Sequence, residues 1–168
     1  MKQHLHLLAA YHRWTFDVLY AALLPLDDAR YRADLGLFFR SIHGTLNHLL
    51  VADKVWFGRM VATPFAVSGL DAELQSERPA LEQALYKQSA RWQPWLRTQS
   101  EDQLATPRAY SNMSGAHFAQ ETATLVLHVF NHATHHRGQI STAITACGLA
   151  APEMDLIWYL RQRPAELS

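Results

Sequence analysis

Four histidines lie close together near the C-terminal end of the chain, in the stretch HVFNHATHHRGQ from residue 128 to residue 139. His128, His132 and His136 follow one another at intervals of four residues, which places them along one face of an α-helix. Two imidazoles at this interval can chelate one divalent ion, with each nitrogen about 2.0–2.1 Å from it. The metalloprotease motif H-E-x-x-H uses the same interval, but its glutamate is absent here. The spacing therefore predicts chelation of a metal ion without the general base of that motif.

A third ligand must come from elsewhere, because two imidazoles do not make a stable site. His48 lies among leucines that should face the interior, in the stretch SIHGTLNHLLVAD, and facing helices of a bundle build metal sites in the core. His43 lies about 140° away around the same helix, so it is not expected to bind the same ion. Three neutral imidazoles leave a coordination position open for water or substrate, which is typical of a catalytic site. The competing interpretation is a set of hydrogen-bonded core histidines without an ion.

Helices must position these side chains, and apolar residues at helical spacing predict four long ones. They are expected over residues 3–24, 35–61, 77–99 and 119–147. Pro94 should kink the third helix, because proline lacks the N–H that a helix interior needs. Four long helices imply an all-α fold, the four-helix bundle. The connections are not all tight, so they can join the helices in a non-sequential order.

Shorter features complete the expected chain path. The polar stretch PLDDARYRAD, residues 25–34, should be a loop. Residues 101–118 predict a short hairpin around Ser114 and Gly115, directly before the last long helix. The amphipathic segment from Met154 to Arg163 predicts a short C-terminal helix.

Composition limits the classes of function. A length of 168 residues suits one domain, spanning residues 1–168. Lysine plus arginine equals aspartate plus glutamate, at 15 each, so no basic surplus favours a nucleic-acid partner. No apolar stretch approaches the roughly 20 residues that span a membrane, and no signal peptide is evident. The single cysteine, Cys147, fits a reducing compartment. We therefore expect a cytoplasmic protein without a membrane or nucleic-acid partner.

Two stretches resemble the DinB/YfiT-like metalloenzymes, and specifically their DinB (damage-inducible) subgroup. SIHGTLNHLLVADKVWFGR matches the family pattern T-L-N-H-L-L-x-A-D-x-x-W, and HVFNHATHHRGQI matches N-H-x-x-x-H-R-G-Q-I. The stretch YHRWTF is similar to the family's Y-N-x-W-A-N, with His12 and Phe16 in place of the two asparagines. The resemblance covers essentially the whole chain.

The resemblance implies a site and an activity. It implies that His48, His132 and His136 ligate a divalent metal ion, with zinc or nickel expected first. His135 falls on a position that the family often fills with tyrosine, so it is not expected to be a ligand. It also implies a four-helix bundle with non-sequential connections, and a homodimer. Related enzymes mostly use a low-molecular-weight thiol, such as bacillithiol or mycothiol, to transfer or rearrange small electrophiles. The expected function is therefore a metal-dependent thiol S-transferase with a small-molecule substrate.

Several neighbouring residues could support the site. Asn131 and Arg137 flank the expected ligands and could orient them through hydrogen bonds, although exposure to solvent or hydrogen bonding between helices is an equal alternative. Asp53 lies about 140° from His48 around its helix, so it should anchor the bundle rather than act in catalysis. Gln139 has no predicted role. The remaining histidines are expected at the surface or in loops: His4, His6, His12 and His117.

Three other functions compete with the transferase. A metal-dependent hydrolase would use water in place of the thiol. A non-catalytic, stress-related bundle would hold the ion as a structural brace. DNA binding is suggested only by the name of the subgroup, and the neutral charge disfavours it.

Overall fold

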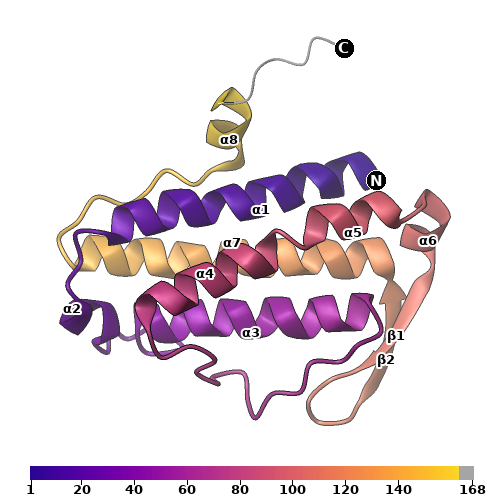
Figure 1. Ribbon diagram of the computed structural model, residues 1–168, viewed down its shortest axis with the longest axis horizontal. Coiled ribbons are helices and arrows are strands. Elements are labelled where there is room, and N and C mark those ends of the chain that lie inside the picture. Colours follow the sequence, from indigo (N-terminus) through magenta and orange to yellow (C-terminus); the bar gives the residue numbers. More distant parts are fainter. Residues whose placement is uncertain (163–168) are drawn as a thin grey trace.

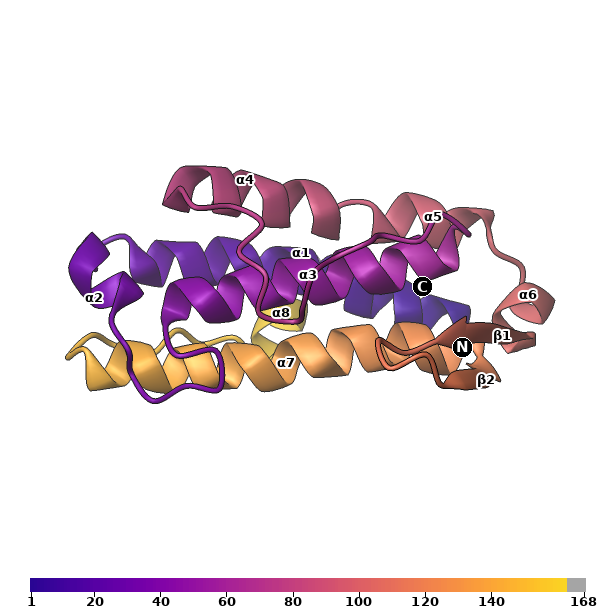
Figure 2. The same ribbon diagram turned by 90° about the horizontal axis from the view of Figure 1, so that it is seen from below.

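Four long helical segments lie side by side along the long axis of the molecule (Figure 1). The structure is a computed structural model, and it describes residues 1–162. The four segments are α1 (Lys2–Leu23), α3 (Ile42–Met60), the pair α4 (Arg78–Ser89) and α5 (Trp92–Thr98), and α7 (Thr122–Ala146). α1 packs against α7 and against the α4–α5 pair, and α3 packs against α7 and α4. Figure 2 shows α7 and the α4–α5 pair on opposite sides of α1 and α3. The predicted all-α bundle is confirmed.

The direction of the helices explains how two distant stretches meet. α1 and α7 run one way along the bundle, whereas α3 and the α4–α5 pair run the other way (Figure 1). The parallel neighbours α3 and α4 are joined by residues 61–77, which return along the side of α3. A Cβ on Gly58 would lie 2.7 Å from the carbonyl oxygen of Thr63, so only glycine lets this connection lie directly on the helix. α7 packs antiparallel to α3, which brings the two histidine stretches together.

Shorter elements lie at the ends and on one side of the bundle: α2 (Asp28–Arg32), α6 (Glu101–Ala105), β1 (Pro107–Ser111), β2 (His117–Glu121) and α8 (Leu156–Gln162). The two strands pair antiparallel, with Ser111 opposite His117. Gly115 has φ 83° in their connecting turn, so the predicted hairpin is confirmed. α8 contacts α1 outside the bundle (Figure 1). It confirms the short C-terminal helix, although Arg163 lies outside the described residues.

Two predicted element boundaries near the first loop were wrong. The expected loop contains α2, which begins because the side chain of Asp27 accepts a hydrogen bond from the backbone N–H of Arg30. The second long helix begins at Ile42 rather than at residue 35. Residues 34–41 form a tight turn instead, with Arg40 at φ 67°, and Ser41 then caps the helix by accepting from the N–H of Gly44.

The third predicted helix is divided rather than kinked. Ala90 and Arg91 separate α4 from α5, and Pro94 lies in the first turn of α5. A missing N–H costs little in a first turn, because those groups have no partner within the helix. α6 was also missed, although Ser100 and Gln103 form a capping box. α7 starts at Thr122 rather than at residue 119 because the preceding residues pair with β1.

A polar cluster divides the interior between two apolar groups. One group includes Phe16 and Leu50, and the other includes Ala9 and Phe57. Between them along α1 and α3, His12 Nε2 lies 3.0 Å from Asp53 Oδ2. The other carboxylate oxygen of Asp53 accepts hydrogen bonds at 2.9 Å from two side chains, those of Gln88 and Trp92.

The polar cluster settles two expectations from the sequence. Asp53 does anchor the bundle, because its partners come from α1, α4 and α5. The placement of His12 at the surface was wrong, since the residue is 2% exposed. His12 lies in register with Leu5, Phe16 and Leu19 on the buried face of α1, so its spacing could have indicated burial. Within residues 1–162, no helix has the length and apolar content to cross a bilayer.

Candidate metal centre

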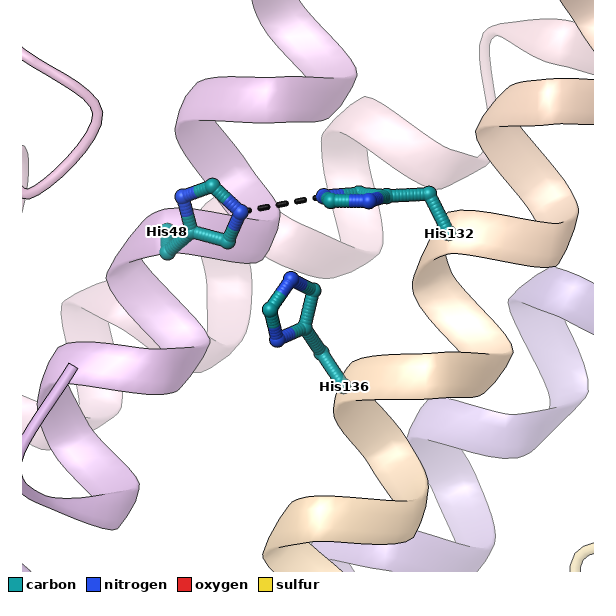
Figure 3. A group of neighbouring side chains, drawn as sticks. All are labelled: His48, His132 and His136. Atoms are coloured by element: carbon teal, nitrogen blue, oxygen red, sulfur yellow. Dashed lines mark hydrogen bonds between the residues drawn. The ribbon is translucent and has the colours of Figure 1, made fainter. Parts of the chain in front are cut away.

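The three predicted ligands meet between α3 and α7, with their rings turned toward one another (Figure 3). α3 contributes His48, and α7 contributes His132 and His136 from successive turns. One ligand atom from each residue lies within 4.8 Å of the other two. The Nε2 atoms of His48 and His132 are 3.0 Å apart, and the ring of His136 lies 4.6 Å and 4.5 Å from those two rings, centre to centre.

This arrangement fits a divalent ion after a small adjustment. Nitrogens that bind one zinc ion at tetrahedral angles are separated by about 3.4 Å. The Nε2 atoms of His48 and His132, which are 3.0 Å apart, must therefore separate by a few tenths of an ångström to share an ion. A small rotation of either ring is enough for this. Imidazole suits zinc and nickel among the divalent metals.

Hydrogen bonds outside the group set the tautomers of two ligands. His48 Nδ1 donates to the backbone carbonyl of Leu70 at 2.8 Å, and His136 Nδ1 donates to Oε1 of Gln139 at 2.8 Å. Because these oxygens are acceptors, each Nδ1 carries the proton and each Nε2 keeps a free lone pair for an ion. His132 Nε2 lies 3.0 Å from His48 Nε2, so binding of an ion through this atom needs the proton of His132 on Nδ1.

Asn131 and Arg137 match the alternative expectation of exposure or hydrogen bonding between helices, and other residues orient the predicted ligands. Arg137 donates to Thr134 Oγ1 at 2.8 Å and to His12 Nδ1 at 3.2 Å, so it points toward α1 and not toward the predicted ligands. Asn131 is exposed. Gln139 and Leu70 orient the predicted ligands instead, because they accept the hydrogen bonds from His136 and His48. Gln139 could have been found from its position three residues after His136, on the same helix face, whereas nothing in the sequence marks the carbonyl of Leu70.

Other nearby histidines lie outside the group. His43 Nε2 is 2.9 Å from Glu73 Oε1, so the expectation that His43 faces elsewhere is confirmed. The ring of His128 stacks 5.6 Å from that of His132, but it also packs on Trp56. His135 is exposed, and the amide of Gln139 lies 3.3 Å from its Nε2.

An aromatic ring covers one side of the histidine group. Phe39 stacks on His48 with ring centres 3.8 Å apart and lies 5.6 Å from His136. A Cβ on Gly44 would collide with the carbonyl oxygen of Phe39, so this close approach requires glycine. Phe39 and Leu70 also line a cavity of about 380 Å³. Both residues also contact His48, although none of the three histidines lines this cavity.

Burial keeps the three imidazoles uncharged. The pKa of His48 is lowered to about 4, mainly by loss of solvent and also by the neighbouring His136, against the opposing hydrogen bond to Leu70. Burial first, and then the other histidines, lower the pKa of His132 to about 3. Burial also lowers the pKa of His136, against the opposing hydrogen bond to Gln139. At neutral pH the group is therefore in the deprotonated state that metal binding needs.

Comparison with known proteins places this fold and site in a family. The model of the DinB family matches residues 1–166, so the chain belongs to the DinB family. The chain is 27% identical over 157 residues to protein DinB of Bacillus subtilis, covering 89% of this chain and 90% of that protein. A DinB-like protein of Bacillus cereus has the same fold, with a TM-score of 0.62 at 17% identity, over 83% of this chain and 91% of the other. The resemblance predicted from the two histidine stretches is thus confirmed.

Proposed function

We propose that the protein is a divalent-metal-dependent enzyme that transfers a low-molecular-weight thiol to a small electrophile. The observation that carries the proposal is the convergence of three neutral imidazoles from α3 and α7. Their nitrogens fit zinc or nickel, and the hydrogen bonds to Leu70 and Gln139 hold two of them in the tautomer that binds an ion.

The residues of the chain have distinct roles in this proposal. His48, His132 and His136 would hold the ion. A divalent ion supplies Lewis acidity, which lowers the pKa of a thiol or a water and provides a nucleophile at neutral pH. Phe39 shields one side of the site from water, and the cavity that it shares with Leu70 would receive the electrophile.

Two alternatives use the same three histidines. A hydrolase would activate water in place of the thiol. A non-catalytic bundle would use the ion as a brace, for which a fourth protein ligand is typical. Within residues 1–162 the candidate group consists of three histidines and no further cysteine, aspartate or glutamate, which favours an open position and hence an enzyme.

Elemental analysis with a thiol assay tests the proposal. The wild type should purify with about one equivalent of zinc or nickel and should consume a thiol, such as bacillithiol or mycothiol, in the presence of a small electrophile. His132→Ala should lose both the ion and the activity. His128→Ala is the matched control, because His128 lies one turn away on the same helix face but outside the group, and it should keep both.

Each result separates the candidates. Equal metal content in wild type and His132→Ala would refute the site. Bound metal with ester hydrolysis and no thiol consumption would establish the hydrolase. Bound metal that raises the melting temperature without any turnover would establish the brace.

We also propose that the protein works as a cytoplasmic homodimer. The family resemblance supports the dimer, and the lone Cys147 fits a reducing compartment. Light scattering on the purified protein should give twice the mass of 19.1 kDa, whereas the mass of one chain would contradict the proposal.

A further inference from the structure

Arg59 is a cation that packs on two neighbouring aromatic rings at the far end of α3. It lies on the same face of α3 as His48, about 16 Å further along the helix axis at 1.5 Å per residue. Its guanidinium carbon is 4.3 Å from the ring centre of Trp56 and 4.8 Å from that of Tyr110. Nη2 donates to the carbonyl of Ser111 at 2.8 Å. Stacking fixes the plane of the guanidinium and leaves donors along its edge for another partner.

Positive charge gathers around Arg59 without a balancing carboxylate. Arg108 Nη1 donates to the backbone carbonyl of Arg59, and Lys54 lies 4.9 Å from the ring centre of Phe65 on the adjacent connection. Within residues 1–162, no ion pair joins any of these three cations to an aspartate or glutamate. Burial lowers the pKa of Arg59, as expected for a cation that has lost water and gained no anion.

A cavity of about 290 Å³ opens beside this guanidinium. Ser111 lines the cavity, and its carbonyl accepts from Arg59, so the charged end of Arg59 lies at the cavity wall. Much of the remaining lining is apolar and comes from α3, the 61–77 connection and the hairpin turn: Val55, Pro64, Phe65, Val67 and Met113.

We propose that this cavity binds a small organic acid, with its carboxylate on Arg59 and its apolar body against the cavity wall. A planar guanidinium edge matches the two oxygens of a carboxylate. The apolar lining favours an acid with a hydrocarbon or aryl body over inorganic phosphate, because phosphate gains nothing from apolar contact. This inference does not depend on the proposed metal chemistry, because none of the three candidate ligands lines the cavity.

Paired probes that differ only in charge test this proposal. Benzoate and the neutral benzamide are titrated into the purified protein, with binding followed by calorimetry and by tryptophan fluorescence, to which Trp56 beside the cavity contributes. Benzoate should bind saturably and at least about tenfold more tightly than benzamide, as expected of a hydrogen bond to a charged group. Inorganic phosphate should bind more weakly than benzoate. His132→Ala should bind benzoate as the wild type does, which separates this cavity from the metal centre.

Variants assign the binding to Arg59. Arg59→Gln should weaken benzoate binding at least about tenfold and leave benzamide binding unchanged. Arg91→Gln is the matched control, because Arg91 also stacks on an aromatic ring, 4.2 Å from the centre of Phe57, but lies away from the cavity. If Arg59→Gln fails to fold, Val67→Asp places a carboxylate on the cavity wall and should abolish benzoate binding. Three outcomes would overturn the proposal. They are equal affinity for benzoate and benzamide, phosphate binding as tight as benzoate binding, or an equal loss of benzoate affinity in Arg59→Gln and Arg91→Gln.

Discussion

Buried histidines in this protein have protonation states that their neighbours determine. His48 and His136 donate through Nδ1 to oxygens that can only accept, which leaves Nε2 unprotonated on each ring. His12 behaves in the opposite way, because its Nδ1 accepts from Arg137 and its Nε2 donates to Asp53. The contact between His12 and Asp53 is therefore a hydrogen bond from a neutral imidazole and not an ion pair.

Replacement of Gln139 should weaken metal binding without unfolding the protein. Gln139→Ala removes the acceptor that holds His136 in its metal-binding tautomer, so we expect the dissociation constant for zinc to rise about 10- to 100-fold. Gln139→Glu keeps an acceptor and should restore most of the affinity. Competition with a chromophoric chelator measures both values. An unchanged affinity in Gln139→Ala would show that the hydrogen bond does not tune the site.

His12 should make the stability of the protein depend on pH. Burial is the main cause that lowers the pKa of His12 below its usual value of about 6.5, and the hydrogen bond to Asp53 opposes it. On acidification the unfolded chain therefore gains this proton before the folded protein does. The contribution of His12 to the free energy of unfolding is complete above about pH 6.5 and is lost as the pH falls toward the lowered pKa.

Urea titrations of the metal-free protein at pH 7.5 and 5.0 measure this effect. The loss of free energy of unfolding between the two pH values should be smaller in His12→Gln than in the wild type. His4→Gln changes an exposed histidine on the same helix and should leave the loss as in the wild type. Identical losses in wild type and His12→Gln would contradict the pKa shift.

Among the helices, α3 depends on glycine where other chain segments cross it. Gly44 admits the backbone of Phe39, whose ring stacks on His48, and Gly58 admits the 61–77 connection that supplies Leu70. The start of α3 thus positions both His48, a candidate metal ligand, and the side chain that covers it. Gly138 on α7 differs, because an added Cβ there would meet no atom within 4 Å.

The same substitution should therefore have opposite effects at these two positions. Gly138→Ala should raise the free energy of unfolding by about 1 kcal/mol, since alanine is the better helix former. Gly44→Ala should lower it by about 1–3 kcal/mol, as expected of overpacking, and should also weaken metal binding by displacing Phe39 from His48. Thermal unfolding and zinc competition measure both variants. A stabilised Gly44→Ala would contradict the close contact, and a destabilised Gly138→Ala would indicate that a second copy packs on this part of α7.

Sequence alone predicted the long helices and the three converging histidines because both follow a simple period. The spacing of His132 and His136 fixes their common face, and the leucines around His48 fix its inward direction. The failures have local causes. The turn before Ile42 depends on the positive φ of Arg40, and the break at Ala90 and Arg91 has no glycine or proline at the break itself. The hydrogen bond from His48 to the backbone carbonyl of Leu70 could not be predicted, because every residue has such a carbonyl.

Across the molecule, the polar cluster around Asp53 on α3 joins five of the helices. Its partners come from α1, α4 and α5, and His12 extends the cluster to Arg137 on α7. Because these groups are buried, each depends on the others for its hydrogen bonds. The cluster thereby fixes how α7 presents its histidines to α3.

Loss of Asp53 should destabilise the bundle as a unit. Asp53→Ala leaves the donors of Gln88, Trp92 and His12 buried without an acceptor, so we expect the free energy of unfolding to fall by about 3–5 kcal/mol. Asp17→Ala, which removes an exposed partner of Arg13, should cost less than about 1 kcal/mol. Chemical denaturation compares the two variants. A small loss in Asp53→Ala would show that water replaces the missing carboxylate.

The wide separation of the ligands along the chain has a consequence for biosynthesis. His48 and His132 are 84 positions apart, so at a translation rate of about 5–20 residues per second the second arrives roughly 4–17 s after the first. If the proposed ion binds, a nascent polypeptide can capture it with all three rings only after His136 has left the ribosome. Ribosome-arrested chains that stop short of His132 should therefore retain no zinc through washing, whereas released chains that contain residues 1–168 should retain it.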